Sequence, residues 1–212
     1  MTSALTRTAL PLLAATLVAG GAAAQQTDPR LERVDAATRP TVAALVDSAR
    51  AALLPTEPLI QRALEGATKR ASGDLIVAAV RRLAVDLGHA RDALGSTASP
   101  AELTAGAAAL HAGASPTILA QLRQTRREPL TMPLAVLADL VASGVPVDSA
   151  AAAVLALAAR ARDADLVEFR RAVERDIALG APPAAATAAA ATATALIVDV
   201  NAGARQQRPG RP

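Results

Sequence analysis

The segment from Leu130 to Ala190 decides the fold, and its sequence is LTMPLAVLADLVASGV, then PVDSAAAAVLALAARARDADLVEFRRAVERDIALGA, then PPAAATAAA. Twice in this segment an apolar pattern of helical period ends at a glycine, Gly144 or Gly180. One apolar residue and a proline follow, Pro146 or Pro182, and a new helical pattern begins at once. Glycine just past one helix and proline at the start of the next are typical of a tight corner. The segment therefore predicts consecutive short helices joined by tight corners.

Two earlier places carry a similar corner, so that four positions can be aligned along the chain. These are Arg70, Gly113, Gly144 and Gly180, and a serine or a proline stands two residues after each of them. Their spacings of 43, 31 and 36 residues, with an apolar pattern before each corner, suit stacked helical hairpins, as in α-solenoids. A plain helical bundle is the alternative, because any tight corner uses Gly, Ser and Pro.

The rest of the chain also has helical periodicity, and no segment has the alternating pattern of a strand. Ser99 and Glu102 have the spacing of a capping box at a helix start. An apolar stripe from Leu75 predicts a long helix that ends near Leu94, and the last helix is expected over residues 182–198. We therefore expect an all-α fold of about nine short helices in stacked antiparallel hairpins, without a β-sheet.

Residues 1–24 have the pattern of a secretory signal peptide. Arg7 is the one charge before an apolar run from Ala9 to Ala19, and Ala22–Ala24 supply a small-residue cleavage site. A retained membrane anchor is the alternative, but the apolar run is short for a bilayer span. The chain has no cysteine, which excludes a lipid-anchored lipoprotein. We expect an exported protein, periplasmic or secreted, whose mature chain begins at Gln25.

Three further segments are expected after the signal peptide. Residues 25–40 are polar and are expected to be a loose leader, and residues 41–199 should form a single helical-hairpin domain. Residues 200–212 contain mostly Gly, Gln, Arg and Pro, so we expect a disordered basic tail there. Residues 184–198 are apolar but short for a membrane helix and lack flanking aromatic residues. We expect them to form a core or capping helix, and no transmembrane span after signal cleavage.

Aromatic residues are nearly absent, because the chain has one phenylalanine, Phe169, and no tryptophan or tyrosine. Sites for sugars, nucleobases and quaternary amines use aromatic faces, and protein interfaces favour Tyr and Trp. The chain is poorly equipped for sites of these kinds. Its formal net charge of +3, from 22 basic and 19 acidic residues, is a weak signal for nucleic acid. We expect no nucleic-acid partner.

The sequence contains none of the motifs G-x-S-x-G, S-x-x-K and H-E-x-x-H, which are typical of nucleophilic or metal-dependent catalysis. Asp86, His89 and Asp92 are spaced so that they share one helical face. A metal site would need a further strong ligand, and the chain has no cysteine and only one other histidine, His111. We interpret these side chains as solvated, and we predict neither an enzyme nor a cofactor or metal site.

Six arginines are candidate contacts for an anionic partner. Three of them form a cluster at a predicted helix end, where cations also suit the negative end of the helix dipole. The other three lie in the basic tail. In chain order the six are Arg123, Arg126, Arg127, Arg205, Arg208 and Arg211.

The Gly-Val-Pro type of corner and the Ala-rich helices resemble exported, Ala-rich helical-repeat proteins of GC-rich bacteria, and this resemblance implies no particular activity. The leading hypothesis is an exported, non-catalytic helical-repeat protein that serves as a binding or scaffold module in the bacterial envelope. Its partner would be another protein or an envelope component. The alternative hypothesis is a surface binder that Arg-rich segments hold on anionic lipid or acidic glycan. Salt distinguishes the two hypotheses, because only electrostatic tethering weakens steeply with ionic strength.

Overall fold

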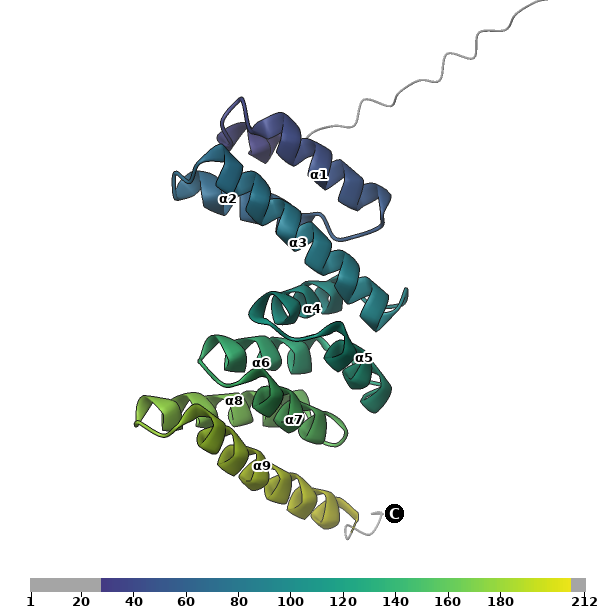
Figure 1. Cartoon of the computed structure of the whole chain (residues 1–212). Coiled ribbons are helices and arrows are strands. Elements are labelled where there is room, and N and C mark those ends of the chain that lie inside the picture. Colours follow the sequence, from purple (N-terminus) through teal and green to yellow (C-terminus); the bar gives the residue numbers. More distant parts are fainter. Residues whose placement is uncertain (1–27, 207–212) are drawn as a thin grey trace, which may run out of the picture.

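The computed structural model describes residues 28–206, and for residues 204–206 it describes the backbone alone. This part of the chain is all helical (Figure 1). Within it there are nine α-helices, one short 3-10 helix and no strand, which confirms the predicted fold class. The elements are η1 (Pro29–Arg33), α1 (Arg39–Ala51), α2 (Glu57–Thr68), α3 (Gly73–Leu94), α4 (Pro100–Ala112), α5 (Pro116–Thr125), α6 (Thr131–Ala142), α7 (Val147–Ala158), α8 (Asp163–Ala178) and α9 (Pro183–Gln206).

Four helical hairpins follow one another along the molecule: α2–α3, α4–α5, α6–α7 and α8–α9 (Figure 1). Helices α4, α6 and α8 pack side by side and form a first row. Helices α3, α5, α7 and α9 form a second row, in which each helix packs on the next. At the N-terminal end α1 packs on α3, and η1 packs on α2. Each hairpin thus contacts mainly its neighbours, which is the packing of a helical-repeat array.

The core is built from leucine, valine and alanine, with Phe169 as the one large ring. Small residues let helices approach closely where the hairpins meet. Gly106 of α4 is an example, because a Cβ atom there would lie 3.1–3.3 Å from side-chain atoms of Ala90, Leu94 and Leu119. Gly106 stands seven residues before the corner at Gly113, a place where the sequence pattern has apolar or small residues. A side chain at this position would therefore be tight, and these neighbours of α3 and α5 would have to shift by a few tenths of an ångström.

The four aligned corners share one backbone geometry. Arg70, Gly113, Gly144 and Gly180 have left-handed φ angles of 56°, 113°, 89° and 96°. At each corner this residue donates its N–H to the carbonyl three residues earlier, and the next residue donates to the carbonyl five residues earlier. This pair of hydrogen bonds is the Schellman motif that closes α-helices. Each corner joins the two helices of one hairpin, so the alignment found in the sequence corresponds to one repeated structural element.

The starts of the helices after the corners differ in detail from the prediction. Pro146 and Pro182 each stand immediately before the first residue of the helix and not inside it, because α7 begins at Val147 and α9 at Pro183. The predicted capping box at the start of α4 is confirmed: the Glu102 N–H donates to Ser99 Oγ over 3.2 Å, and the Ser99 N–H donates to Glu102 Oε2 over 2.8 Å.

Substitutions at the corners are expected to change stability in opposite directions. Gly144→Val should lower the free energy of unfolding by about 1–3 kcal/mol, because a β-branched residue is strained at a φ of 89° even though space is open around it. Arg70→Gly should raise it by about 0.5–1 kcal/mol, because it relieves the same strain at an equivalent corner. Urea unfolding followed by circular dichroism measures both, with Ser143→Ala as the neutral control. Equal effects of both substitutions would contradict the shared geometry.

The expectation of a loose leader over residues 25–40 is wrong for its described part. The 3-10 helix η1 is followed by α1, and the side chains of Leu31 and Val34 are buried. The Arg39 guanidinium donates to the backbone carbonyls of Leu31, Glu32 and Val34. Two apolar side chains and one arginine are thus enough to fix this segment. The predicted signal peptide and the predicted cleavage site before Gln25 lie outside the described residues.

Helix α9 is longer than predicted. It continues through Val198 to Gln206, so the backbone of residues 200–206 is helical and not disordered, whereas residues 207–212 lie outside the described part. The apolar helical segment is therefore longer than the 15 residues, 184–198, that the sequence pattern indicated. Residues 183–203 form one helix that is long and apolar enough, by length and composition, to cross a membrane. In the array this helix packs against α7 and α8 and buries Ala186, Ala190 and Val198.

Candidate functional site

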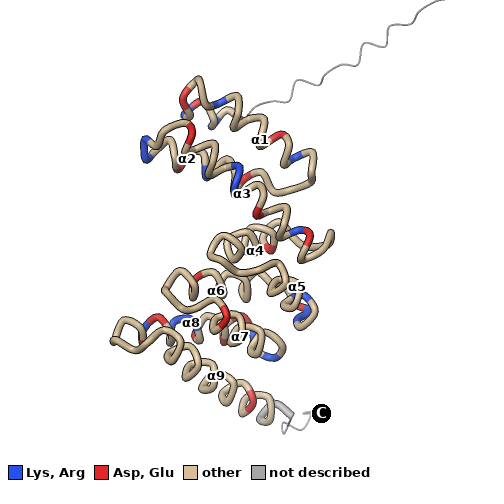
Figure 2. Tube along the Cα trace, viewed as in Figure 1, with Lys and Arg blue, Asp and Glu red and all other residues tan. Residues whose placement is uncertain are grey.

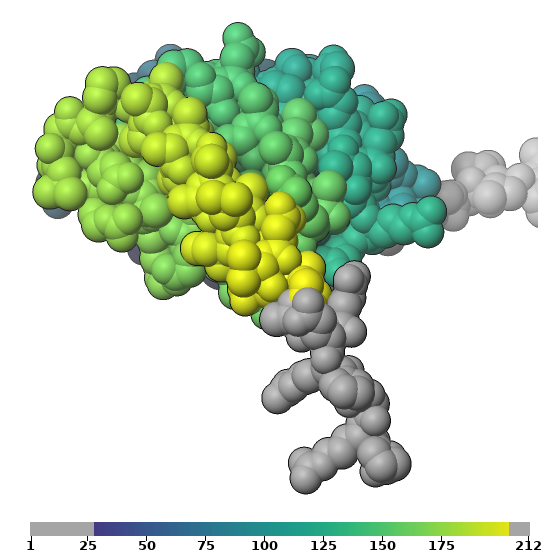
Figure 3. All heavy atoms as spheres, turned by 90° about the horizontal axis from the view of Figure 1, so that it is seen from below, coloured from purple at the N-terminus to yellow at the C-terminus, as the bar shows by residue number. Residues whose placement is uncertain are grey.

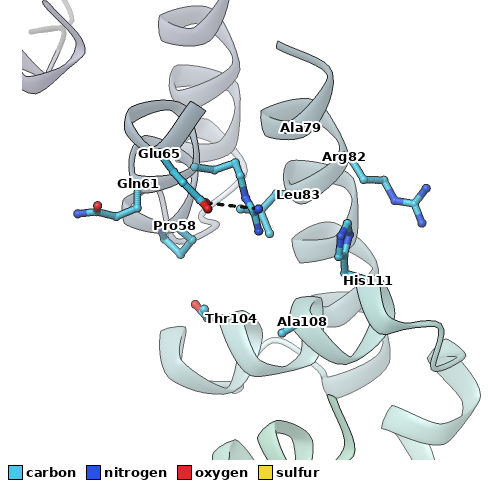
Figure 4. A pocket seen from close by; sticks show the side chains of 10 residues that line it. Pro58, Gln61, Glu65, Ala79, Arg82, Leu83, Thr104, Ala108 and His111 are labelled. Carbon is cyan, nitrogen blue, oxygen red and sulfur yellow. Dashed lines mark ion pairs between the residues drawn. The ribbon is translucent and has the colours of Figure 1, made fainter. Parts of the chain in front are cut away.

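A hollow lies between the first two hairpins of the described part of the chain. It is a groove of about 610 Å³ between α2 and α4, with α3 as its floor (Figure 4). We call it the α2–α4 groove. Its lining residues are Pro58, Gln61, Arg62, Glu65, Ala79, Arg82, Leu83, Thr104, Ala108 and His111.

The groove exists because α3 is the longest helix before α9. With 22 residues, α3 packs against four helices, α1, α2, α4 and α5. Helix α2 therefore lies apart from α4, whereas α4, α6 and α8 touch side by side (Figure 1). If α2 is counted with α4, α6 and α8 in the first row, the gap between α2 and α4 is the opening in this row among the described helices. The long spacing of 43 residues between the corners at Arg70 and Gly113 is the sequence signal of this opening.

The groove has an apolar floor and a charged rim. Ala79 and Leu83 of α3 and Ala108 of α4 supply small or aliphatic surface, whereas Glu65 and Arg62 of α2 pair over 3.6 Å at the rim. The Lys69 ammonium also binds Glu65, at 2.6 Å, and its hydrogen bond lowers the pKa of that carboxyl. The rim thus keeps both signs of charge at neutral pH.

A buried carboxylate lies next to two residues that line the groove. Asp86 of α3 is only 3% exposed, and its two oxygens accept from Arg82 Nε at 3.2 and 3.3 Å. His111 Nδ1 of α4 lies 3.5 Å from Asp86 Oδ2. The carboxylate thus has one partner on its own helix, Arg82, and one on α4, His111. Both partners line the groove. In Figure 4 the Arg82 side chain extends away from α2, and the imidazole of His111 lies beside α3.

This cluster was not predicted from the sequence. Asp86, His89 and Asp92 were expected to be solvated, but Asp86 is buried whereas His89 and Asp92 are exposed. The i, i+4 spacing of Arg82 and Asp86 is the one local signal for the pair. No local signal connects Asp86 with His111, because the stacking of α4 on α3 brings them together.

Nucleophilic catalysis finds little support in the groove. A histidine held by a carboxylate needs a nucleophile within hydrogen-bond reach to form a triad. Thr104 is the one hydroxyl residue that lines the groove, and its Oγ1 donates to the backbone carbonyl of Pro100 at 2.8 Å. The described residues also contain no group of three or more His, Cys, Asp or Glu side chains that could hold a metal ion.

The arginine cluster predicted to contact an anionic partner is largely occupied. Arg123 Nη2 binds Glu102 Oε1 at 2.6 Å. Arg126, whose side chain is 4% exposed, donates to the carbonyl of Ala161 at 3.0 Å and pairs with Asp163 at 2.6 Å. These contacts join the α5–α6 connection to α4 and to the start of α8. Arg126 is therefore buried among internal partners, and Arg123 is half-buried against Glu102.

The other four candidate arginines differ in what the structure describes. Arg127 is exposed at the end of the cluster. Arg205 belongs to the last turn of α9, but its side chain is not described, and Arg208 and Arg211 lie beyond the described residues.

Comparison of the chain with protein-family models, with characterised proteins and with solved structures finds no match in any of the three.

Proposed function

We propose that this chain is an exported, non-catalytic binding module of the bacterial envelope, and that the α2–α4 groove is its binding surface. The observation that carries the proposal is the opening in the first row of helices, about 610 Å³ in volume, with an apolar floor and a charged rim. Ligand sites in proteins are usually concave and mostly apolar, with a few polar groups that fix the orientation of the ligand. The Arg62–Glu65 ion pair and His111, whose Nδ1 lies 3.5 Å from Asp86 Oδ2, supply such groups here.

The shape and chemistry of the groove suit a segment of another polypeptide. The groove lies where a helix of the first row would pack against α2 and α4, so an extended or helical segment fits between them. Aliphatic side chains of the partner would contact Ala79, Leu83 and Ala108, and its polar groups would meet Glu65 and His111. Export is supported by the signal-peptide pattern of residues 1–24. The competing hypothesis of tethering through arginines is weaker, because Arg123 and Arg126 have internal partners.

Site-specific photo-crosslinking tests the proposal. A photoreactive amino acid at Ala79 of α3 should give defined adducts in the envelope of cells that produce the chain. The same amino acid at Ala78, which is exposed on α3 but does not line the groove, should give none of these adducts. Adding Ala108→Arg on the opposite wall should abolish the adducts from position 79, because the new side chain fills the groove.

Circular dichroism of each variant verifies that the array is intact. Identical adducts from positions 78 and 79, or no adducts from position 79, would contradict the groove as the binding surface. Adducts that disappear when the salt concentration is raised would support electrostatic tethering.

A further inference from the structure

The two ends of the array differ in character. At the N-terminal end the outer surface of η1 and α1 presents charged side chains, among them Glu32, Arg33, Asp35 and the Asp47–Arg50 ion pair. Helical-repeat arrays need terminal units with a polar outer face, because an uncovered terminal helix exposes apolar surface. At the C-terminal end, α9 is the last member of the second row. No described helix covers its outer face, whereas α3, α5 and α7 are each covered by the next helix.

The outer face of α9 is uncharged over most of its length. From Ala184 to Val198 the helix contains only Ala, Thr, Leu, Ile and Val, and Asp199 follows at its far end (Figure 2). Leu196, Ile197 and Val200 are 63%, 58% and 71% exposed. Helix α9 lies across the lower surface of the molecule in Figure 3. Only 22% of its most apolar 18-residue stretch is buried. Three large aliphatic side chains therefore project from a surface that otherwise consists mainly of alanine, with the exposed Thr192.

We propose that this outer face of α9 is the contact surface for a second copy of the chain, with the two α9 helices packed antiparallel. The alanines favour a helix as the occupant, because small side chains let two helix backbones approach closely. They disfavour a lipid surface, because interfacial membrane helices combine Lys or Arg with large apolar and aromatic residues. Helix α9 has no aromatic residue and no cation before Arg205.

Charge and symmetry favour a second copy in the antiparallel orientation. Asp199, which pairs with Arg160 at 3.1 Å, is the only ionisable side chain that the structure describes on α9. Antiparallel packing about the middle of the helix, near Ala193, places the two Asp199 carboxylates at opposite ends of the contact. Each Leu196–Val200 cluster then lies against the alanine surface of the other copy. The same patch serves both copies, as a two-fold interface requires.

The size of the face predicts a weak dimer. The exposed stretch from Ala184 to Val200 is roughly 25 Å long and 10 Å wide. Its footprint of roughly 250 Å² is well below the 800 Å² that each partner buries in a standard stable interface. The dimer should therefore form reversibly, with a dissociation constant in the micromolar range or above.

Sedimentation equilibrium from roughly 1 to 500 µM tests the association. The full chain and the chain from Gln25, which retains every described residue, should both show a monomer–dimer equilibrium. Ile197→Glu should raise the dissociation constant at least tenfold, because it places a charge in the apolar contact. The matched control is Leu75→Glu, because Leu75 is 64% exposed on α3 and far from α9. Monomer at all concentrations, or equal weakening by both substitutions, would overturn the proposal.

Single cysteines test the orientation, because the chain contains no cysteine of its own. Ala193→Cys should form a disulfide-linked dimer under mild oxidation, since its two copies meet at the two-fold axis. Ala185→Cys should not, because its two copies would lie about 24 Å apart, well beyond disulfide reach. Equal crosslinking at both positions would overturn the antiparallel arrangement. A monomer whose α9 face binds phosphatidylcholine vesicles, with or without phosphatidylglycerol, and loses this binding on Ile197→Glu would replace the second copy by a membrane.

Discussion

Replacing Phe169 with alanine is expected to lower the free energy of unfolding by about 3–5 kcal/mol. Phe169 is the only aromatic residue of the chain, and its side chain is completely buried on α8. Helix α8 packs against α6 on one side and against α9 on the other, so the ring lies where the last two hairpins meet. The substitution loses the transfer free energy of the buried ring, and the cavity that remains adds a further cost because the surrounding structure relaxes only partly.

Urea unfolding followed by far-ultraviolet circular dichroism measures this loss, because the chain has no tryptophan or tyrosine for fluorescence. Phe169→Leu is the matched control and should cost less than about 1.5 kcal/mol, since leucine keeps most of the volume. Hydrogen exchange on Phe169→Ala should show reduced protection in α6, α8 and α9 before α1 and α2, because an array loosens locally. Uniform loss of protection from α1 to α9 would show one cooperative unit.

The sequence predicts the parts of this fold that depend on local chemistry. The corners at Gly144 and Gly180 follow from the need for a left-handed residue after a helix, and both glycines have that geometry. Alignment of the four corners also identified the one at Arg70. Arginine itself does not indicate a helix end, but Arg70 has the left-handed geometry. The capping box of α4 is equally local, because both of its hydrogen bonds join residues three apart.

Contacts between distant segments could not be predicted in the same way. Arg126 lies in a basic sequence that is typical of an exposed helix end. Only the tertiary structure shows that its guanidinium contacts Ala161 and Asp163. Asp86 and His111 meet through helix packing, although each residue alone has the features of a solvated side chain. The end of α9 was misplaced for a different reason. The apolar pattern stops at Val198, but no proline stops the helix before Gln206.

Glu102 shows how a local motif can also hold distant segments together. Beyond the capping box with Ser99, its Oε1 accepts from Arg123 of α5 at 2.6 Å and from the backbone N–H of Leu130 at 2.9 Å. Leu130 is the residue before α6, so one carboxylate joins the second hairpin to the third. Burial raises the pKa of Glu102, but the hydrogen bonds from Ser99, Leu130 and Arg123 outweigh this effect and lower the pKa to about 2.

Glu102→Gln is therefore expected to destabilise the fold by roughly 3 kcal/mol at neutral pH. This figure corresponds to a pKa that falls from 4.5 in the unfolded chain to about 2 in the folded chain. The neutral amide accepts weaker hydrogen bonds, and it leaves the half-buried Arg123 without its counter-charge. Ser99→Ala should cost only about 1 kcal/mol, because the backbone donors to Glu102 remain. Glu168→Gln, an exposed carboxylate on α8, should leave the free energy of unfolding unchanged.

The pH dependence separates the charge of Glu102 from its size. A carboxyl whose pKa is lowered by folding stabilises the protein fully above its unfolded pKa of about 4.5, and this contribution is lost as the pH falls toward 2. The difference in free energy of unfolding between the wild type and Glu102→Gln should therefore be constant from pH 7 to about pH 5. It should then shrink steadily as the pH is lowered to about 2. Urea unfolding at a series of pH values measures this difference. A difference that stays constant down to pH 2 would mean that the shape of the glutamate, and not its ionised carboxylate, holds the second and third hairpins together.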